Sequence, residues 1–425
     1  MTKVKNIDKD PQVFITGIGL LSGFGIGSND SWRSVGQEKA VIAKKNDWEF
    51  GGLQDQLFGR CAAFEFQEYF KDMQAPFPWR YSQLAMMACK LAIEDAALML
   101  DELDLSRVGL IINSDLGASK AAEEYAFKLY GKGPERVSPF EFTKSVANCV
   151  IGDVARYFKL TGASSFILGE NSVSYGYDLL RNGKADIVIC GCFDEVRDRT
   201  VSNYKERGMT AEKSSSDSMP GSVIEDLYGQ CGKMVLGEAS GFIVLETSAH
   251  ALKRGAKIYA ALAGEYSGCD SLCNEILWER ASRDLAYVME RSLTLSGLEI
   301  ADISFIMGAS SMPWQLQTYE MPAIRAVWMD NPVMYTTIKV RLGETFASSQ
   351  TISLAFAALS LYHRQIPGSG LRNAAMTCAM DGVTIAEKIM DLSDPDHPSR
   401  QHHCMVNSIQ LGGNTSSIIL SSYAA

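Results

Sequence analysis

The most informative segment of the chain is Lys233-Met-Val-Leu-Gly-Glu-Ala-Ser-Gly-Phe-Ile-Val-Leu-Glu246. Its last five residues, Phe242–Glu246, form a short apolar run that is bounded by a Ser-Gly pair. Runs of this length and composition are typical of strands that are buried inside a protein. We therefore predict a buried strand here and examine how the rest of the chain is arranged around it.

Similar runs lie on the N-terminal side of this segment. They predict strands at Val13–Ile18, Val108–Ile112, Ser165–Leu168 and Ile187–Gly191. Between the first two, residues 81–100 predict a helix, because apolar side chains recur there at helical spacing, at Leu84, Met87, Ala88 and Leu91. Lys90 and Glu94 form an i,i+4 pair that flanks this stripe.

After Ala256 the same alternation begins again. It predicts strands at Lys257–Gly264, Ile303–Met307, Met405–Ile409 and Ser417–Leu420, and helices at Arg280–Leu295 and Gln350–Tyr362. An alternation of strands and helices that runs twice favours an α/β protein with two stacked halves, residues 1–256 and 257–425. The two clear loop segments are Glu212–Ser222 and Asp391–His403.

Composition limits the class of protein. The 425 residues contain 40 Lys and Arg against 50 Asp and Glu, a formal net charge of −10, and 46% are hydrophobic. The charge argues against nucleic-acid binding and against an anionic membrane surface. The polar N-terminus does not resemble a signal peptide, and no apolar run approaches a membrane span, so we expect a cytoplasmic protein. The ten scattered cysteines predict buried free thiols.

The sequence gives little support to cofactor, metal or histidine chemistry. Gly17-Ile18-Gly19 follows a predicted strand, but Ser22 replaces the third glycine of a dinucleotide fingerprint, so we predict a tight turn there and no cofactor. No metal-ligand pattern is present. None of the five histidines lies at the end of a predicted strand, where a general base would be expected.

Several segments resemble β-ketoacyl synthases. Val13-Phe-Ile-Thr-Gly-Ile-Gly19 resembles the opening strand of that family, residues 233–246 its central strand, and Lys253-Arg-Gly-Ala-Lys-Ile-Tyr-Ala260 the segment that follows. Residues 182–186 are similar to the turn before a core strand, and Asn407-Ser-Ile-Gln-Leu-Gly-Gly-Asn414 to the glycine-rich C-terminal loop. The resemblance implies a thiolase fold, with two similar α/β halves in α-β-α-β-α layers, and a tight dimer.

The catalytic residues of that family are missing from the matching positions. Counting forward from residues 160–162, the nucleophilic cysteine falls on Asn171, whereas counting backward from Gly183 it falls near Phe166. The two histidine positions fall on Gly308 and Glu344, and only the family's lysine is kept, as Lys339. The degenerate triad is therefore Asn171, Gly308 and Glu344, and we expect no catalytic residue in this chain.

A synthase that has lost its triad resembles the chain-length factor, or ketosynthase β-subunit, of bacterial type II polyketide synthases. There an amide, usually glutamine, replaces the cysteine and often follows glutamate, so Glu170-Asn171 is similar to this arrangement. The resemblance implies a heterodimer with a ketosynthase α-subunit, an acyl carrier protein as a further partner, and no cofactor. It also implies a substrate channel past Leu116, Phe140 and Phe142 and a gate loop at Leu411, Gly412 and Gly413.

Three functions stay open from the sequence. The first is a non-catalytic chain-length factor that helps to elongate a poly-β-ketone, of an aromatic, anthraquinone type or of an aryl polyene type. The second is an autonomous acyltransferase or malonyl decarboxylase that uses Glu170, Ser172 or Glu344, although a serine needs a base to become a nucleophile. The third is a scaffold that only stabilises a partner. Cys149 lies in an apolar segment, which predicts a packed core thiol.

Overall fold

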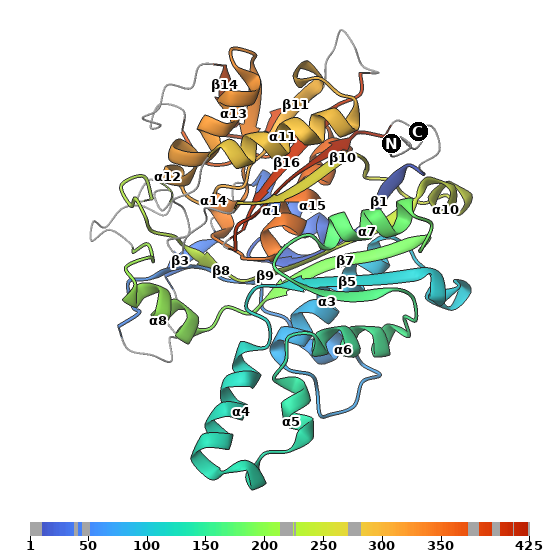
Figure 1. The fold of residues 1–425 in the computed structure, drawn as a ribbon, viewed down its shortest axis with the longest axis vertical. Helices are drawn as coiled ribbons and strands as arrows, with labels where there is room; N and C mark the ends of the chain where they lie inside the picture. The colour runs from blue at the N-terminus through green and yellow to red at the C-terminus, as the bar shows by residue number, and fades with distance from the viewer. Residues whose placement is uncertain are drawn as a thin grey trace, which may run out of the picture.

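The computed structural model describes residues 11–37, 41–44, 52–212, 224, 227–270, 282–372, 382–392, 400–410 and 412–423. Its main sheet has two similar parts (Figure 1). The first part contains β1 (Val13–Ser22), β9 (Ala239–Thr247), β7 (Ile187–Asp194), β5 (Val108–Ser114) and β6 (Ser164–Leu168), in that spatial order. The second contains β10 (Ala260–Cys269), β17 (Asn414–Ser421), β16 (His403–Ile409), β11 (Ile303–Met307), β12 (Val333–Thr336) and β14 (Val383–Ile385).

The two parts repeat one topology. In the first, β1, β9 and β7 pair antiparallel, and β7, β5 and β6 pair parallel. In the second, β10, β17 and β16 pair antiparallel, and β16, β11 and β12 pair parallel. A short antiparallel pairing of β1 with β10 joins them. This internal repeat confirms the predicted α/β protein with two similar halves, while the boundary at residues 256/257 stays a prediction.

Helices form the other layers. On the outer faces, α3 (Arg80–Asp95) packs on β1, β9 and β7, and α11 (Ser282–Ser296) on β10 and β17. Between the two sheets lie α7 (Ser172–Arg181), which packs on β7 and β5, and α15 (Ser348–His363), which contacts both β9 and β16. Residues 348–361 of α15 are all buried. A helix that is buried on every side fits between two sheets, which is the expected α-β-α-β-α arrangement.

Shorter elements complete the described part of the chain. The helices are α1 (Ser28–Gly36), α2 (Phe66–Tyr69), α4 (Ser119–Lys132), α5 (Pro139–Lys144), α6 (Cys149–Phe158), α8 (Asp198–Glu206), α10 (Ser248–Lys253), α12 (Pro313–Gln315), α13 (Met321–Trp328) and α14 (Lys339–Leu342). The strands are β2 (Gly25–Ile26), β3 (Ile42–Lys44), β4 (Leu57–Gly59), β8 (Leu236–Gly237), β13 (Gln365–Ile366) and β15 (Met390–Asp391). In this part no helix is both long and apolar enough to cross a bilayer.

Most predicted elements are present, with shifted ends. Strand β11 has the predicted bounds, but α3 ends at Asp95 because Ala97 has a left-handed φ of 51° and turns the chain out of the helix. The predicted Lys90–Glu94 ion pair forms at 2.7 Å. Of the predicted loops, residues 213–222 and 393–399 lie outside the described residues, and His403 belongs to β16.

Gly17 and Gly19 do not form the predicted turn. Both lie inside β1, where α3 packs directly on the strand. A Cβ at Gly19 would lie 2.0 Å from the Ala88 carbonyl oxygen, and one at Gly17 would lie 2.5 Å from that of Ala92. These glycines therefore allow a helix backbone to approach the sheet, and they form no phosphate-binding loop.

The cysteine prediction is only partly right. Of the eight cysteines in the described residues, all are free, and Cys61, Cys89, Cys190, Cys192 and Cys404 are buried. Cys231 and Cys269 are exposed, because they lie on a turn and at the open end of β10. The other two cysteines lie outside the described residues.

Candidate functional site

The site lies where parallel strands of both halves end. Polar side chains follow β5, β6 and β7 in the first half and β11 and β12 in the second. Asp194 at the end of β7 accepts a hydrogen bond from the Ala347 amide, just before α15, at 2.9 Å. The carboxyl ends of the two sets of parallel strands therefore meet at α15, the usual place for a site in an α/β fold.

Asn171 is the residue directly before α7. Its backbone is left-handed, with φ 90° and ψ 13°, a conformation that asparagine tolerates better than most residues. Its backbone amide donates to Gln350 Oε1 at 3.2 Å, and its side-chain Oδ1 lies 3.5 Å from Ser267 Oγ. Of the two positions that counting left open, Asn171 therefore starts the helix, whereas Phe166 lies within β6.

At the two other degenerate positions, Gly308 and Glu344, other side chains take the place of the family's histidines. At Gly308, a Cβ would lie 2.0 Å from the Tyr335 hydroxyl, which donates to Glu320 at 2.8 Å. Tyr335 therefore fills the space beside this strand end. Glu344 pairs with Lys339 at 3.0 Å, and both side chains are only 3% exposed. Glu344 also accepts hydrogen bonds from Ser349 Oγ at 2.9 Å and from the Phe346 amide at 3.1 Å.

Glu170 is a buried carboxyl beside Asn171. Burial raises the pKa of Glu170 to about 8, and its hydrogen bond with Ser408 and the charge of Lys339 lower it only in part. Glu170 Oε2 accepts a short hydrogen bond from Ser408 Oγ. Its Oε1 has no hydrogen-bond partner among the described residues. At neutral pH this group is therefore mostly a neutral acid.

The residues suggested as alternative nucleophiles lack a base. Ser172 Oγ is buried without a partner among the described residues. The four described histidines contact other parts of the fold, through Glu246 for His250, Trp32 for His363, Ser304 for His402 and Ser421 for His403. Cys149 lies 2.8 Å from the Tyr81 hydroxyl, and burial raises the pKa of its thiol, which favours the unreactive form.

Sequence reasoning missed two carboxyl groups at this site. Asp194 accepts from Ser114 Oγ at 2.7 Å and from the Leu116 amide at 2.8 Å, and burial raises its pKa well above the usual range. Asp115 accepts from Gln410 Nε2 at 2.5 Å, and burial raises its pKa to about 6. Asp115 and Asp194 both lie just after the end of a predicted strand. This position in the sequence was the signal that could have identified them as site residues.

The predicted channel residues occupy different surroundings in the single chain. Leu116 is half-buried and packs in a cluster that includes Phe346. Phe140 and Phe142 lie on α5, where 66% and 53% of each residue is exposed. Helices α4 and α5 project together from one end of the molecule (Figure 1). The single chain therefore does not bury the two phenylalanines at the closed end of a channel.

The gate loop connects β16 with β17. Leu411 lies outside the described residues. Gly413 is buried with a left-handed φ of 96°, and its amide donates to the Gln410 carbonyl at 3.1 Å, which closes a tight turn. Gly412 is exposed. Gln410 lies directly against Gly169, so this turn covers the segment that leads to Asn171.

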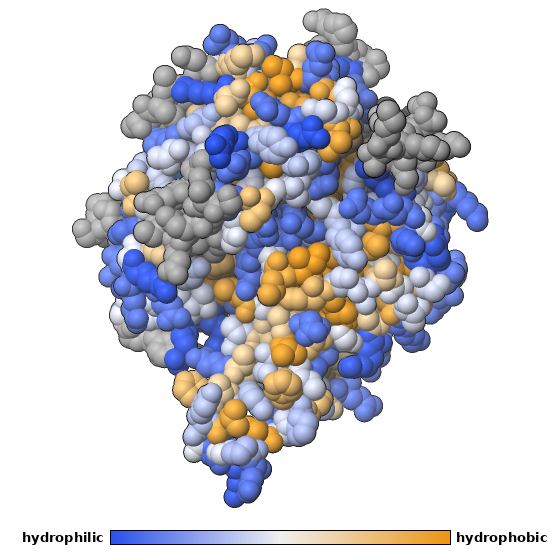
Figure 2. Space-filling view, in the orientation of Figure 1, coloured by the Kyte–Doolittle hydropathy of each residue, from blue (hydrophilic) through white to orange (hydrophobic). Residues whose placement is uncertain are grey.

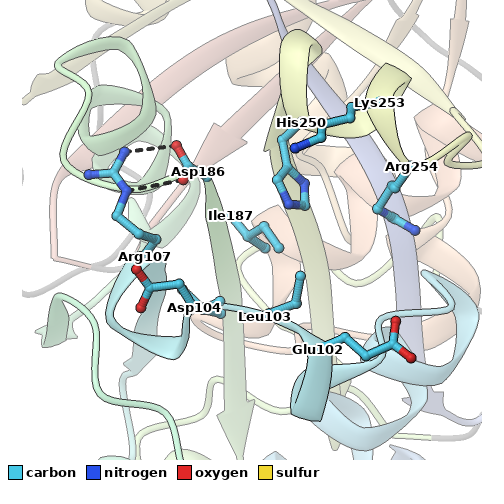
Figure 3. A pocket seen from close by; sticks show the side chains of 10 residues that line it. Glu102, Leu103, Asp104, Arg107, Asp186, Ile187, His250, Lys253 and Arg254 are labelled. Atoms are coloured by element: carbon cyan, nitrogen blue, oxygen red, sulfur yellow. Dashed lines mark hydrogen bonds and ion pairs between the residues drawn. The ribbon is translucent and has the colours of Figure 1, made fainter.

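A second hollow lies at the opposite ends of the same strands. A cavity of about 330 Å³ borders the first residues of β5 and β7, and its walls come from α10 and the segment before β5 (Figure 3). Arg107 and Asp186 form an ion pair at 2.7 Å on one side of it, and Arg254 pairs with buried Glu246. Because both of its arginines are already paired with carboxylates, we assign it a structural role.

Apolar side chains also gather on the outer surface. Figure 2 shows them over the middle of one face and over the α4–α5 projection. Strand β6 is an edge strand of the sheet, and its Leu168 is 71% exposed. Other exposed apolar side chains are Phe127 and Tyr130 on α4, Val146 after α5 and Tyr175 on α7. Among the described residues no cluster of His, Cys, Asp and Glu is arranged to hold a metal ion.

Known proteins share this fold. The 3-oxoacyl-(acyl-carrier-protein) synthase 2 of Synechocystis is 24% identical over 389 residues, which cover 89% of this chain and 92% of that protein. The structure of the ishigamide ketosynthase/chain length factor matches with a TM-score of 0.82 and 22% identity, over 98% of this chain and 100% of that one. A type II PKS acyl-carrier protein in complex with its ketosynthase, bound to the hexaketide, matches with a TM-score of 0.79 and 18% identity, over the same shares.

These similarities define the class of protein. The fold is the mixed α/β, thiolase-like fold of ketosynthases, as expected, over nearly the whole chain. A family model described as "Beta-ketoacyl synthase, N-terminal domain" matches residues 10–251, more than half of the chain. The chain therefore belongs to the β-ketoacyl synthase family.

Proposed function

We propose that this chain is a non-catalytic chain-length factor. It would pair with an active ketosynthase α-subunit and help to elongate a poly-β-ketone carried by an acyl carrier protein. The observation that carries the proposal is the amide of Asn171 at the residue before α7, with a backbone φ of 90°. With Asn171, Gly308 and Glu344 at the three catalytic positions, the site lacks the family's nucleophile and both imidazoles. It keeps the family's lysine, Lys339, which pairs with Glu344.

The exposed apolar surface supports pairing with another subunit. Strand β6 presents an unpaired edge among the described residues, and an exposed edge strand with an apolar side chain invites association. The phenylalanines of α5 and Tyr130 of α4 add aromatic side chains, which are enriched at subunit interfaces. We propose the α-subunit as the partner, and the ketosynthase/chain length factor match agrees with this choice.

Phe140 and Phe142 fit a channel that closes only in the heterodimer. Their exposure in the single chain leaves them available to line a tunnel between subunits. A poly-β-ketone needs such a closed tunnel because it would cyclise in water. The product is an aromatic, anthraquinone-type chain in our preferred version and an aryl polyene in the other.

An autonomous acyltransferase or decarboxylase is the second candidate. The feature that favours it is Glu170, a neutral acid at pH 7 with one oxygen free of partners in the described residues. Such a group can donate a proton in catalysis. It lies beside a helix start where the hydroxyl of Ser172 has no base among the described residues, so we rank this function second.

Reconstitution separates the two candidates. The chain, the α-subunit and the carrier protein are combined with malonyl units, and acyl adducts are located by mass spectrometry. We expect no adduct on this chain, normal product with Asn171→Ala, and no product when the α-subunit's cysteine is replaced by alanine. Malonyl decarboxylation by the chain alone, if abolished by Glu170→Gln, would support the second candidate instead.

Chain length is tested in the same reaction. Phe140→Ala and Phe142→Ala each remove a ring from the proposed tunnel wall, so products should become longer while malonyl consumption stays similar. Leu116→Trp should shorten them. The measurement is the mass distribution of the products. Parental lengths from all three variants would assign these residues to packing alone.

A further inference from the structure

A separate cavity of about 580 Å³ lies between α5, α6 and the segment 73–79 that leads into α3. Its volume is in the range of pockets that enclose drug-sized ligands. The walls are mostly apolar and rich in rings, with Phe77, Trp79, Phe140 and Tyr157 among them. None of the lining residues belongs to the Asn171 site, so the cavity needs its own explanation.

One wall of this cavity is charged. Lys144 and Asp153 form an ion pair at 2.6 Å, with side chains only 15% and 7% exposed. The other Asp153 oxygen accepts a hydrogen bond from Ser82 Oγ at 2.8 Å. The two Asp153 oxygens are therefore already engaged, and Lys144 is neutralised.

Arg156 supplies the remaining charge. Its guanidinium lies 3.7 Å from Asp153 and its side chain is 78% exposed, so the contact is loose. Two cations thus share one buried carboxylate, and the wall carries one excess positive charge. A guanidinium can turn to form paired hydrogen bonds with a carboxylate ligand.

We propose that this cavity binds an aromatic monocarboxylate. The flat apolar body would lie among the rings of Phe77, Trp79 and Phe140, and the carboxylate would meet Arg156 at the charged wall. A single excess charge does not suit a polyanion such as a nucleotide. The cavity shares Phe140 with the proposed tunnel wall, but it contains no residue of the degenerate site, and binding to the single chain is measured without the α-subunit, so the outcome is independent of the chain-length role.

Calorimetry with 2-naphthoate and two comparison compounds, decanoate and 2-naphthylmethanol, tests the proposal on the full-length chain. We expect 2-naphthoate to bind saturably at one site per chain, more tightly than decanoate, which has the charge without the rings. The neutral alcohol 2-naphthylmethanol should bind more weakly. Arg156→Gln should weaken 2-naphthoate about fivefold, as expected for one partly exposed charge pair, and leave the alcohol unchanged.

Two further variants serve as controls. Arg136→Gln removes the same charge from the exposed turn between α4 and α5, outside the cavity lining, and should leave binding unchanged. Thr143→Trp places an indole in the cavity from an exposed lining position and should abolish binding of 2-naphthoate and of 2-naphthylmethanol, with the circular dichroism spectrum retained. The proposal is overturned if 2-naphthoate shows no saturable binding, if decanoate binds more tightly, or if Arg136→Gln weakens binding as much as Arg156→Gln.

Discussion

Glu170→Gln should change how the stability of the chain depends on pH. Burial raises the pKa of Glu170 to about 8 from a reference value of 4.5. Between these pH values the folded chain holds a proton that the unfolded chain releases, so the free energy of unfolding falls as pH rises. A tenfold change in proton affinity is worth about 1.4 kcal/mol, which makes the full loss about 5 kcal/mol, reached above pH 8. Below pH 4.5 this loss is absent.

Glutamine keeps the shape of the neutral acid and has no proton to lose. We expect the variant and the parent to be similarly stable at pH 5, and the variant to be more stable by several kcal/mol at pH 8.5. The measurement is urea denaturation at a series of pH values and one fixed protein concentration. Glu124→Gln, at an exposed position on α4, is the matched control. Parallel pH profiles for parent and Glu170→Gln would refute the reasoning, because Glu170 would then be ionised in the fold.

Three further changes probe the degenerate site and the edge strand. Glu344→Ala leaves buried Lys339 without its ion-pair partner and should lower the free energy of unfolding by about 3–5 kcal/mol in urea. Gly308→Ala should destabilise the chain by about 1–3 kcal/mol in the same assay, since the added methyl meets a tyrosine hydroxyl. Leu168→Asp should weaken the complex with the α-subunit at least tenfold by analytical ultracentrifugation, whereas Leu252→Asp, also exposed but on α10, should not.

The pattern of the sequence predicted most of the long strands and the three longest helices in their order, but it missed β12, β14 and shorter helices such as α6 and α13. Strand β11 has its predicted bounds, and α15 differs by two residues at one end and one at the other. The Gly17–Gly19 segment was misinterpreted, because a glycine that admits a neighbouring helix and a glycine that makes a turn look alike in a sequence. The difference depends on where α3 packs, which local pattern does not contain.

The site was predictable only in part. Counting along the chain left two positions open, Asn171 and Phe166, and the structure has Asn171 directly before α7 and Phe166 within β6. The contact of Asp115 with Gln410 joins residues almost 300 positions apart, so it arises from tertiary packing. The exposure of Phe140 and Phe142 was likewise missed, since an apolar side chain in a short helix is usually a core residue and the sequence does not reveal that α5 projects.

The burial of α15 on every side has a consequence for protein engineering. The helix follows β12 in the C-terminal half but packs on β9 of the N-terminal half as well as on β16. A chimaera that joins the N-terminal half of one relative to the C-terminal half of another would therefore pack α15 of the second protein against β9 of the first. Recombination among such subunits should preserve folding when the crossover moves α15 together with the faces of β9 and β16 that it touches. The halves share a topology, but they are not interchangeable modules.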